Sequence, residues 1–95
     1  MPLSLRRRTL VHETMLHIAS AVVKTRPANQ DAVSATIADL PGADVHAVDH
    51  GRIIVVLEAR QHRDLATTLD HIAGLDGVLS ATLVFEHAEP EEDPP

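Results

Sequence analysis

The fold is decided by Arg52-Ile53-Ile54-Val55-Val56-Leu57-Glu58-Ala59, whose unbroken β-branched run is the strongest strand signal in the chain. Asp49-His50-Gly51 comes directly before it and suits a tight turn. Residues 44–48 precede that turn and form the partner strand. The three segments together predict a β-hairpin in the middle of the sequence.

A strand and a helix are predicted ahead of this hairpin. Residues 18–23 form a short aliphatic run, and Pro27 follows shortly after it, where proline suits the first turn of a helix. The helix is expected to end at Leu40-Pro41-Gly42, because proline and glycine interrupt helices. Its apolar positions recur at helical spacing, at Val33, Ile37 and Leu40.

A second helix and a last strand follow the hairpin. Leu65, Leu69 and Ile72 repeat the helical spacing, Gly74 suits the position just past a helix end, and residues 77–85 read as a strand. The order is therefore βαββαβ. This order predicts an α+β fold, the ferredoxin-like sandwich, in which a four-stranded antiparallel sheet carries both helices on one face.

The chain is short enough to form one domain only. A chain of 95 residues buries about 60 to 65% of its unfolded surface in a single core. We expect a flexible N-terminal tail over residues 1–15 and the ferredoxin-like domain over residues 16–87. Residues 88–95 are acidic and proline-rich, with little to bury, and are predicted to form a disordered C-terminal tail.

The N-terminal tail superficially resembles an export signal. Arg6-Arg7-Arg8 precedes an apolar stretch, but His12, Glu13 and His17 interrupt that stretch, so we reject the interpretation. Residues 14–23 form the longest uncharged run before Lys24, which is too short to span a membrane.

Composition excludes several classes of function. Eight basic residues against fourteen acidic ones give a net charge of −6, which repels nucleic acids and anionic membranes. Phe85 is the one aromatic residue, so stacking on bases is not available. The absence of cysteine removes disulfides and thiolate nucleophiles, and the cytoplasm is the default location. We predict neither a nucleic-acid nor a membrane partner.

Catalysis and metal binding are not predicted. The serines lack a Gly-x-Ser-x-Gly motif, and no glycine-rich phosphate loop occurs, so we expect no catalytic residues and no cofactor. His46, Asp49 and His50 lie close together around the hairpin turn. Spacing fixes no third and fourth ligand beside the two histidines, and we assign no metal.

Strand alternation assigns two faces to the sheet. The face under the helices is predicted to contain the apolar residues Ala19, Ala21, Val23, Ile53, Val55, Leu57, Leu79, Ala81, Leu83 and Phe85. The uncovered side, which we call the open face, is predicted to contain Ile18, Ser20, Val22, Ile54, Val56, Val78, Ser80, Thr82 and Val84. This second set is too apolar for a surface that meets only water. A partner segment and a homodimer fit this pattern equally well.

Four segments of the sequence resemble the NapD family, and they occur in the same order and spacing. They are residues 18–23, 40–45, 51–59 and 77–87. The resemblance implies a cytoplasmic chaperone that binds the twin-arginine signal peptide of the periplasmic nitrate reductase catalytic subunit. Such a chaperone holds the subunit back from export until the molybdenum cofactor is inserted. The resemblance also implies that the peptide docks as a helix on the open face.

The predicted peptide-binding residues combine the open face with three carboxylates for the arginines. They are Ile18, Ser20, Val22, Ile54, Val56, Glu58, Ser80, Thr82, Val84, Asp49 and Glu86. Each carboxylate taken singly also fits an ordinary solvated surface group. We expect a monomer or a weak homodimer. Two alternatives stay open: an ACT- or RAM-like small-molecule-sensing or oligomerisation domain, and competition by Arg6-Arg7-Arg8 for the chain's own peptide site.

Overall fold

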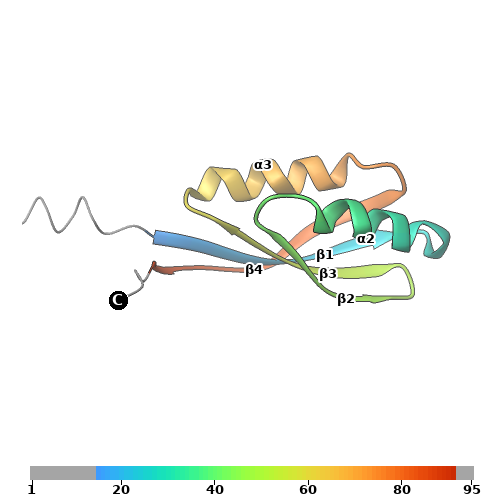
Figure 1. The fold of residues 1–95 in the computed structure, drawn as a ribbon, viewed down its shortest axis with the longest axis horizontal. Coiled ribbons are helices and arrows are strands. Elements are labelled where there is room, and N and C mark those ends of the chain that lie inside the picture. The colour runs from blue at the N-terminus through green and yellow to red at the C-terminus, as the bar shows by residue number, and fades with distance from the viewer. Residues whose placement is uncertain (1–14, 92–95) are drawn as a thin grey trace, which may run out of the picture.

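A computed structural model of the chain describes residues 15–91. Its elements follow the predicted βαββαβ order, with one short 3-10 turn added (Figure 1). They are β1 (Met15–Thr25), η1 (Pro27–Asn29), α2 (Gln30–Ala38), β2 (Ala43–Asp49), β3 (Arg52–Ala59), α3 (His62–Ala73) and β4 (Val78–Pro90). The predictions made for residues 1–14 and 92–95 lie outside the described residues.

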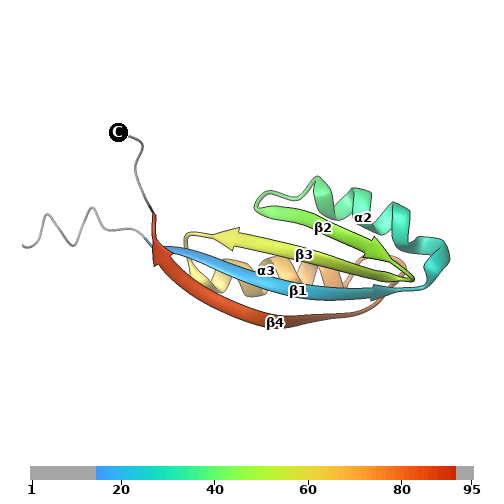
Figure 2. The same cartoon turned by 90° about the horizontal axis from the view of Figure 1, so that it is seen from below.

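The four strands form one antiparallel sheet in the order β2-β3-β1-β4. Both helices lie on the same side of this sheet (Figure 1), and Figure 2 shows the strands from the uncovered side, with α3 behind them. The ferredoxin-like α+β fold is therefore confirmed. No helix within residues 15–91 is long and apolar enough to cross a membrane.

The core lies between the sheet and the two helices. Val33 and Ile37 of α2 and Leu65 and Ile72 of α3 are buried against the sheet. Burying each large aliphatic side chain stabilises the fold by roughly 1.5–3 kcal/mol, so these four helical anchors fix which face is covered. The sheet contributes the buried residues Ala19, Ala21, Val23, Ile53, Val55 and Leu57, all predicted for this face.

The tip of the β2–β3 hairpin is held against the rest of the fold. Its two central residues, His50 and Gly51, both have positive φ (51° and 79°), as a two-residue hairpin turn with the favoured twist requires. The Thr25 N–H donates to the Gly51 carbonyl at 2.7 Å, and the Gly51 N–H donates to Gln30 Oε1 at 2.6 Å. A Cβ on Gly51 would lie 2.5 Å from the Thr25 carbonyl oxygen, so only glycine fits.

Strand β4 departs from the predicted alternation at two places. Ser20 pairs with Phe85 and Ala21 pairs with Leu83, so Val84 is an extra residue at a β-bulge. A second register shift, between Lys24 and Thr25 of β1, leaves Leu79 without a paired position. Each extra residue changes the face of the residues beyond it.

Three face assignments on β4 were therefore wrong. Phe85 and Leu79 were predicted for the core but are 59% and 62% exposed. Val78 was predicted for the open face, yet it pairs with the buried Thr25 and packs against the core. Ala81 and Leu83 lie between the two bulges and face the core as predicted.

Both terminal strands are longer than the sequence suggested. The domain was predicted to end at residue 87, but β4 continues to Pro90 and pairs with the start of β1, where Met15 opposes Pro90 and Leu16 opposes Glu89. Residues 88–90, predicted to be disordered, belong to this strand. The polar composition of these residues gives no strand signal. The strand continues there because its backbone pairs with β1, and its side chains bury little apolar surface.

Candidate functional site

The open face has an apolar centre that crosses three strands. Val22 of β1 lies between Ile54 of β3 and Thr82 of β4, and in the next row Ser20 lies opposite Val56. No helix covers this face of the strands (Figure 2), and Val22, Ile54 and Val56 remain partly exposed. The sheet register thus brings together the predicted residues Ile18, Ser20, Val22, Ile54, Val56, Ser80 and Thr82 on one surface.

The bulge in β4 adds an aromatic side chain to this surface. Phe85 opposes Ser20 and so shares its face, and its ring lies 5.5 Å from that of His87, centroid to centroid. Val84, predicted for the open face, is 59% exposed, as is Phe85. Sequence reasoning missed Phe85, because strict alternation assigns it to the core and nothing in the local residues signals the bulge.

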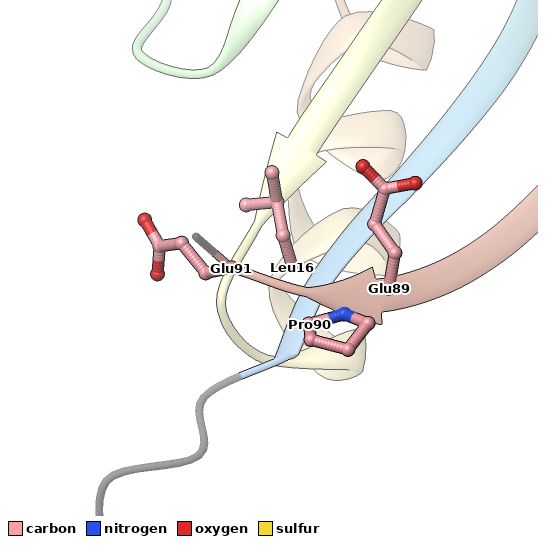
Figure 3. Close-up of a pocket in the computed structure, with 4 residues that line it drawn as sticks. All are labelled: Leu16, Glu89, Pro90 and Glu91. Atoms are coloured by element: carbon pink, nitrogen blue, oxygen red, sulfur yellow. The ribbon is translucent and has the colours of Figure 1, made fainter. Parts of the chain in front are cut away.

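One end of the open face is acidic. Glu58 pairs with Ile18, and Glu89 pairs with Leu16 on the neighbouring strands. Figure 3 shows Leu16 between the carboxylates of Glu89 and Glu91, at a depression of about 590 Å³ lined by Leu16, Glu89, Pro90 and Glu91. Leu16, Glu89 and Glu91 were not among the predicted site residues, since the two strands were expected to span only residues 18–23 and 77–85.

Glu91 and Glu89 already have partners among residues 15–91. Glu91 Oε2 accepts from Arg60 at 2.7 Å, and Glu89 Oε2 lies 3.2 Å from Nε2 of His87. Glu58 is exposed and forms no ion pair with any other residue of the described range 15–91. This end of the face therefore offers carboxylates for which a cationic segment could compete.

The opposite end of the open face is mixed in charge. Asp49 pairs with Arg52 across the hairpin, and Arg52 in turn lies opposite Lys24 of β1. The Asp49 carboxylate also contacts Nδ1 of His50 at 2.6 Å. Two cationic side chains thus lie in the row that contains Asp49, so the charge changes from acidic to partly basic along the face.

Glu86 lies on the other side of the sheet from the remaining predicted residues. It opposes Ala19, which is a core position, and its carboxylate contacts Nδ1 of His62 at the start of α3. The bulge at Val84 accounts for the difference, because it shifts every later residue of β4 to the face opposite to the one that alternation assigns. The open face therefore contains Glu58 and Asp49 but not Glu86.

The histidines around the hairpin form two separate pairs. His46 Nε2 lies 3.2 Å from Asp44 Oδ2, and His50 Nδ1 lies 2.6 Å from Asp49 Oδ1. Neither pair belongs to a group of three metal-ligating side chains within the described part of the chain.

These features define a class of protein: a ferredoxin-like α+β domain that leaves one apolar, charge-graded sheet face uncovered. The chain belongs to the NapD family, because the family model described as NapD protein matches residues 16–90. It is similar to the chaperone NapD of Paracoccus pantotrophus, with 38% identity over 82% of this chain and 70% of that protein. Chaperone NapD of Escherichia coli K12 is 30% identical over 80% of this chain and 90% of its own length.

A solved structure of a NapD protein agrees with this assignment, and a second solved structure shares the fold. The solution structure of the E. coli Tat proofreading chaperone protein NapD matches with a TM-score of 0.71 and 30% identity, over 84% of this chain and 88% of that one. A Pyrococcus furiosus transcriptional regulatory protein of the AsnC family matches with a TM-score of 0.57 and 15% identity, over 98% of this chain and 67% of that one. The second likeness shows the fold alone. Family membership favours the chaperone interpretation over a small-molecule-sensing domain.

Proposed function

We propose that this chain is a cytoplasmic chaperone that binds the twin-arginine signal peptide of the periplasmic nitrate reductase catalytic subunit. By binding the signal peptide, the chaperone delays export of the catalytic subunit until the molybdenum cofactor has been inserted. The observation that carries the proposal is the uncovered apolar sheet face with carboxylates at one end. The E. coli relative, a Tat proofreading chaperone, supports it.

The apolar centre of the face fits the apolar zone of a signal peptide. Such a zone has about 7 to 15 apolar residues and forms an amphipathic or apolar helix when it docks on a hydrophobic surface. Val22, Ile54 and Val56 form the floor of this surface, and Phe85 projects at its β4 edge. The bulge thus widens the apolar surface toward β4.

The charge gradient sets the direction of the bound peptide. Arg52 and Glu58 are six residues apart on β3, which is about 20 Å of strand, so adjacent arginines can meet only one end of the face. Lys24 and Arg52 disfavour arginines beside Asp49, whereas Glu58 and Glu89 pair with no lysine or arginine in the ladder. Arg60, at the same end as Glu58 and Glu89, is already ion-paired with Glu91. The arginines therefore bind near Glu58 and Glu89, and the apolar zone extends toward Lys24.

Calorimetric titration with the signal peptide tests this proposal. We expect one-to-one binding that weakens when the twin arginines are replaced by alanine, and that weakens similarly in a Glu58→Gln, Glu89→Gln variant. Asp49→Asn is the matched control, because it removes one carboxylate at the other end of the face and should change affinity less than threefold. If neither peptide produces heat or chemical-shift changes, the proposed function is wrong. A larger loss of affinity in Asp49→Asn than in the Glu58→Gln, Glu89→Gln variant would reverse the proposed direction.

A further inference from the structure

Three potential metal ligands converge on the helix side of the sheet, away from the open face. His17, His62 and Glu86 come from β1, α3 and β4, and one ligand atom of each lies within 4.8 Å of the others. They form the one such group of three within residues 15–91. We propose that these three side chains bind a divalent transition-metal ion of the zinc type.

The backbone explains why these residues meet. His17 opposes Ala88 and Ala19 opposes Glu86, so His17 and Glu86 are diagonal neighbours on one face of the β1–β4 ladder. His62 is the first residue of α3 and lies above that ladder, with its Nδ1 in contact with Oε2 of Glu86. Three separate elements therefore converge at one point, which no local sequence spacing would indicate.

The donor set and its geometry suit zinc. Two imidazole nitrogens and one carboxylate leave a fourth tetrahedral position for water or for a donor from a partner. Two imidazoles on one tetrahedral ion have ring centroids about 5 Å apart, given metal–nitrogen bonds of about 2.0–2.1 Å. The rings of His17 and His62 are 6.0 Å apart. The His62 side chain is 67% exposed, so it can rotate to close the difference.

Charge at the site is compatible with a cation. The N-terminus of α3 carries a partial positive charge, which by itself disfavours a metal ion. The carboxylates of Glu86 and of Asp64, in the first turn of α3, offset it. A bound ion would join the start of α3 to the β1–β4 ladder beside the last residues of β3, because His17 also pairs with Ala59.

Zinc chloride titration of the peptide-free full chain tests the proposal, with Co²⁺ absorbance as a second probe of tetrahedral coordination. We expect one high-affinity ion per chain, and at least tenfold weaker binding in each of His17→Gln, His62→Gln and Glu86→Gln. His50→Gln is the matched control, because His50 also contacts a carboxylate but lies in no group of three. It should bind zinc within twofold of the unaltered chain.

Thermal melting curves recorded without metal distinguish the loss of a metal ligand from the loss of the folded structure. Because His62 is largely exposed, His62→Gln should melt within a few degrees of the unaltered chain when no metal is present. The proposal is overturned if the unaltered chain and His62→Gln bind zinc equally, or if binding depends on only one of the three residues. It stands independently of the proposed peptide binding, which this titration does not involve.

Discussion

Val22 and Val23 are adjacent on β1 but lie on opposite faces, so the same substitution at each should have opposite consequences. Val22 lies at the centre of the open face between Ile54 and Thr82, whereas Val23 is 0% exposed in the core. Val22→Asp should leave the fold intact and abolish tight peptide binding. Val23→Asp should unfold the domain, because it buries an unpaired carboxylate.

The expected magnitudes follow from burial. In the complex, losing the Val22 contact removes roughly 1.5–3 kcal/mol of apolar burial, and desolvating the new carboxylate adds to the loss. A total of about 2–4 kcal/mol corresponds to a roughly 30-fold to 1,000-fold weaker Kd. Without peptide, Val22→Asp costs about 1 kcal/mol of strand preference, which lowers Tm by about 4–8 °C in a domain of this size.

Calorimetry with the signal peptide and thermal melts by circular dichroism measure the two quantities on the same samples. Val22→Thr serves as a shape-matched control that keeps the strand and removes less apolar area. If Val22→Asp unfolds while Val23→Asp melts normally, the faces are assigned backwards. If Val22→Asp folds and still binds the peptide with unchanged affinity, the open face is not the docking surface.

Three further substitutions test other parts of the structure. Phe85→Ala should weaken peptide binding about tenfold while changing Tm by only a few degrees, because the ring is 59% exposed. Unchanged affinity by calorimetry would mean that the residue at the bulge does not contact the peptide. Ile37→Ala should lower the free energy of unfolding by about 2–5 kcal/mol in urea denaturation, because Ile37 is fully buried; a loss below 1 kcal/mol would contradict the packing of α2 on the sheet. Gly51→Ala should cost at least about 2 kcal/mol in the same assay, because alanine is strained at a φ of 79° and its Cβ meets the Thr25 carbonyl; an unchanged midpoint would mean that the hairpin tip is not docked there.

The sequence was sufficient to predict the parts of the fold that depend on local signals. The β-branched run from Ile53 to Val56, the helical spacing of Val33 and Ile37, and the turn before Arg52 each have a direct physical cause in neighbouring residues. The uncovered apolar face followed from the same alternation, since β1 and β3 carry no bulge relative to each other.

The rest depended on contacts between distant residues. The bulge at Val84 is set by how β4 pairs with β1, and no residue in Leu83-Val84-Phe85 favours a bulge by itself. The continuation of β4 to Pro90 depends likewise on pairing with the start of β1. The meeting of His17, His62 and Glu86 requires both that register and the position at which α3 begins. Sequence spacing alone therefore pointed to the histidines around the hairpin turn as candidate metal ligands instead.

Deleting Val84 provides a direct test of the register on which both sites depend. In the bulged ladder Val84 is the extra residue, so its removal should leave Leu83 opposite Ala21 and Phe85 opposite Ser20 in a regular ladder. Phe85 would stay on the open face, Glu86 would stay beside His62, and Tm should change by no more than a few degrees. If the strand alternated without a bulge, the same deletion would move residues 85–90 to opposite faces.

Cross-strand amide and Hα contacts in NMR spectra distinguish these outcomes, because contacts between Ser20 and Phe85 persist only if the bulge is real. Deleting Leu83 is the matched control, since it also shortens β4 by one residue but removes a side chain that packs against the core. That deletion should lower Tm only a few degrees further than the Val84 deletion, because Val84 would take the place of Leu83 opposite Ala21 with a smaller side chain. Ser20–Phe85 contacts that are absent from the undeleted chain and appear only after deletion of Val84 would contradict the register. Phe85 of the undeleted chain would then lie on the core side and Glu86 on the open face, where alternation alone assigns them.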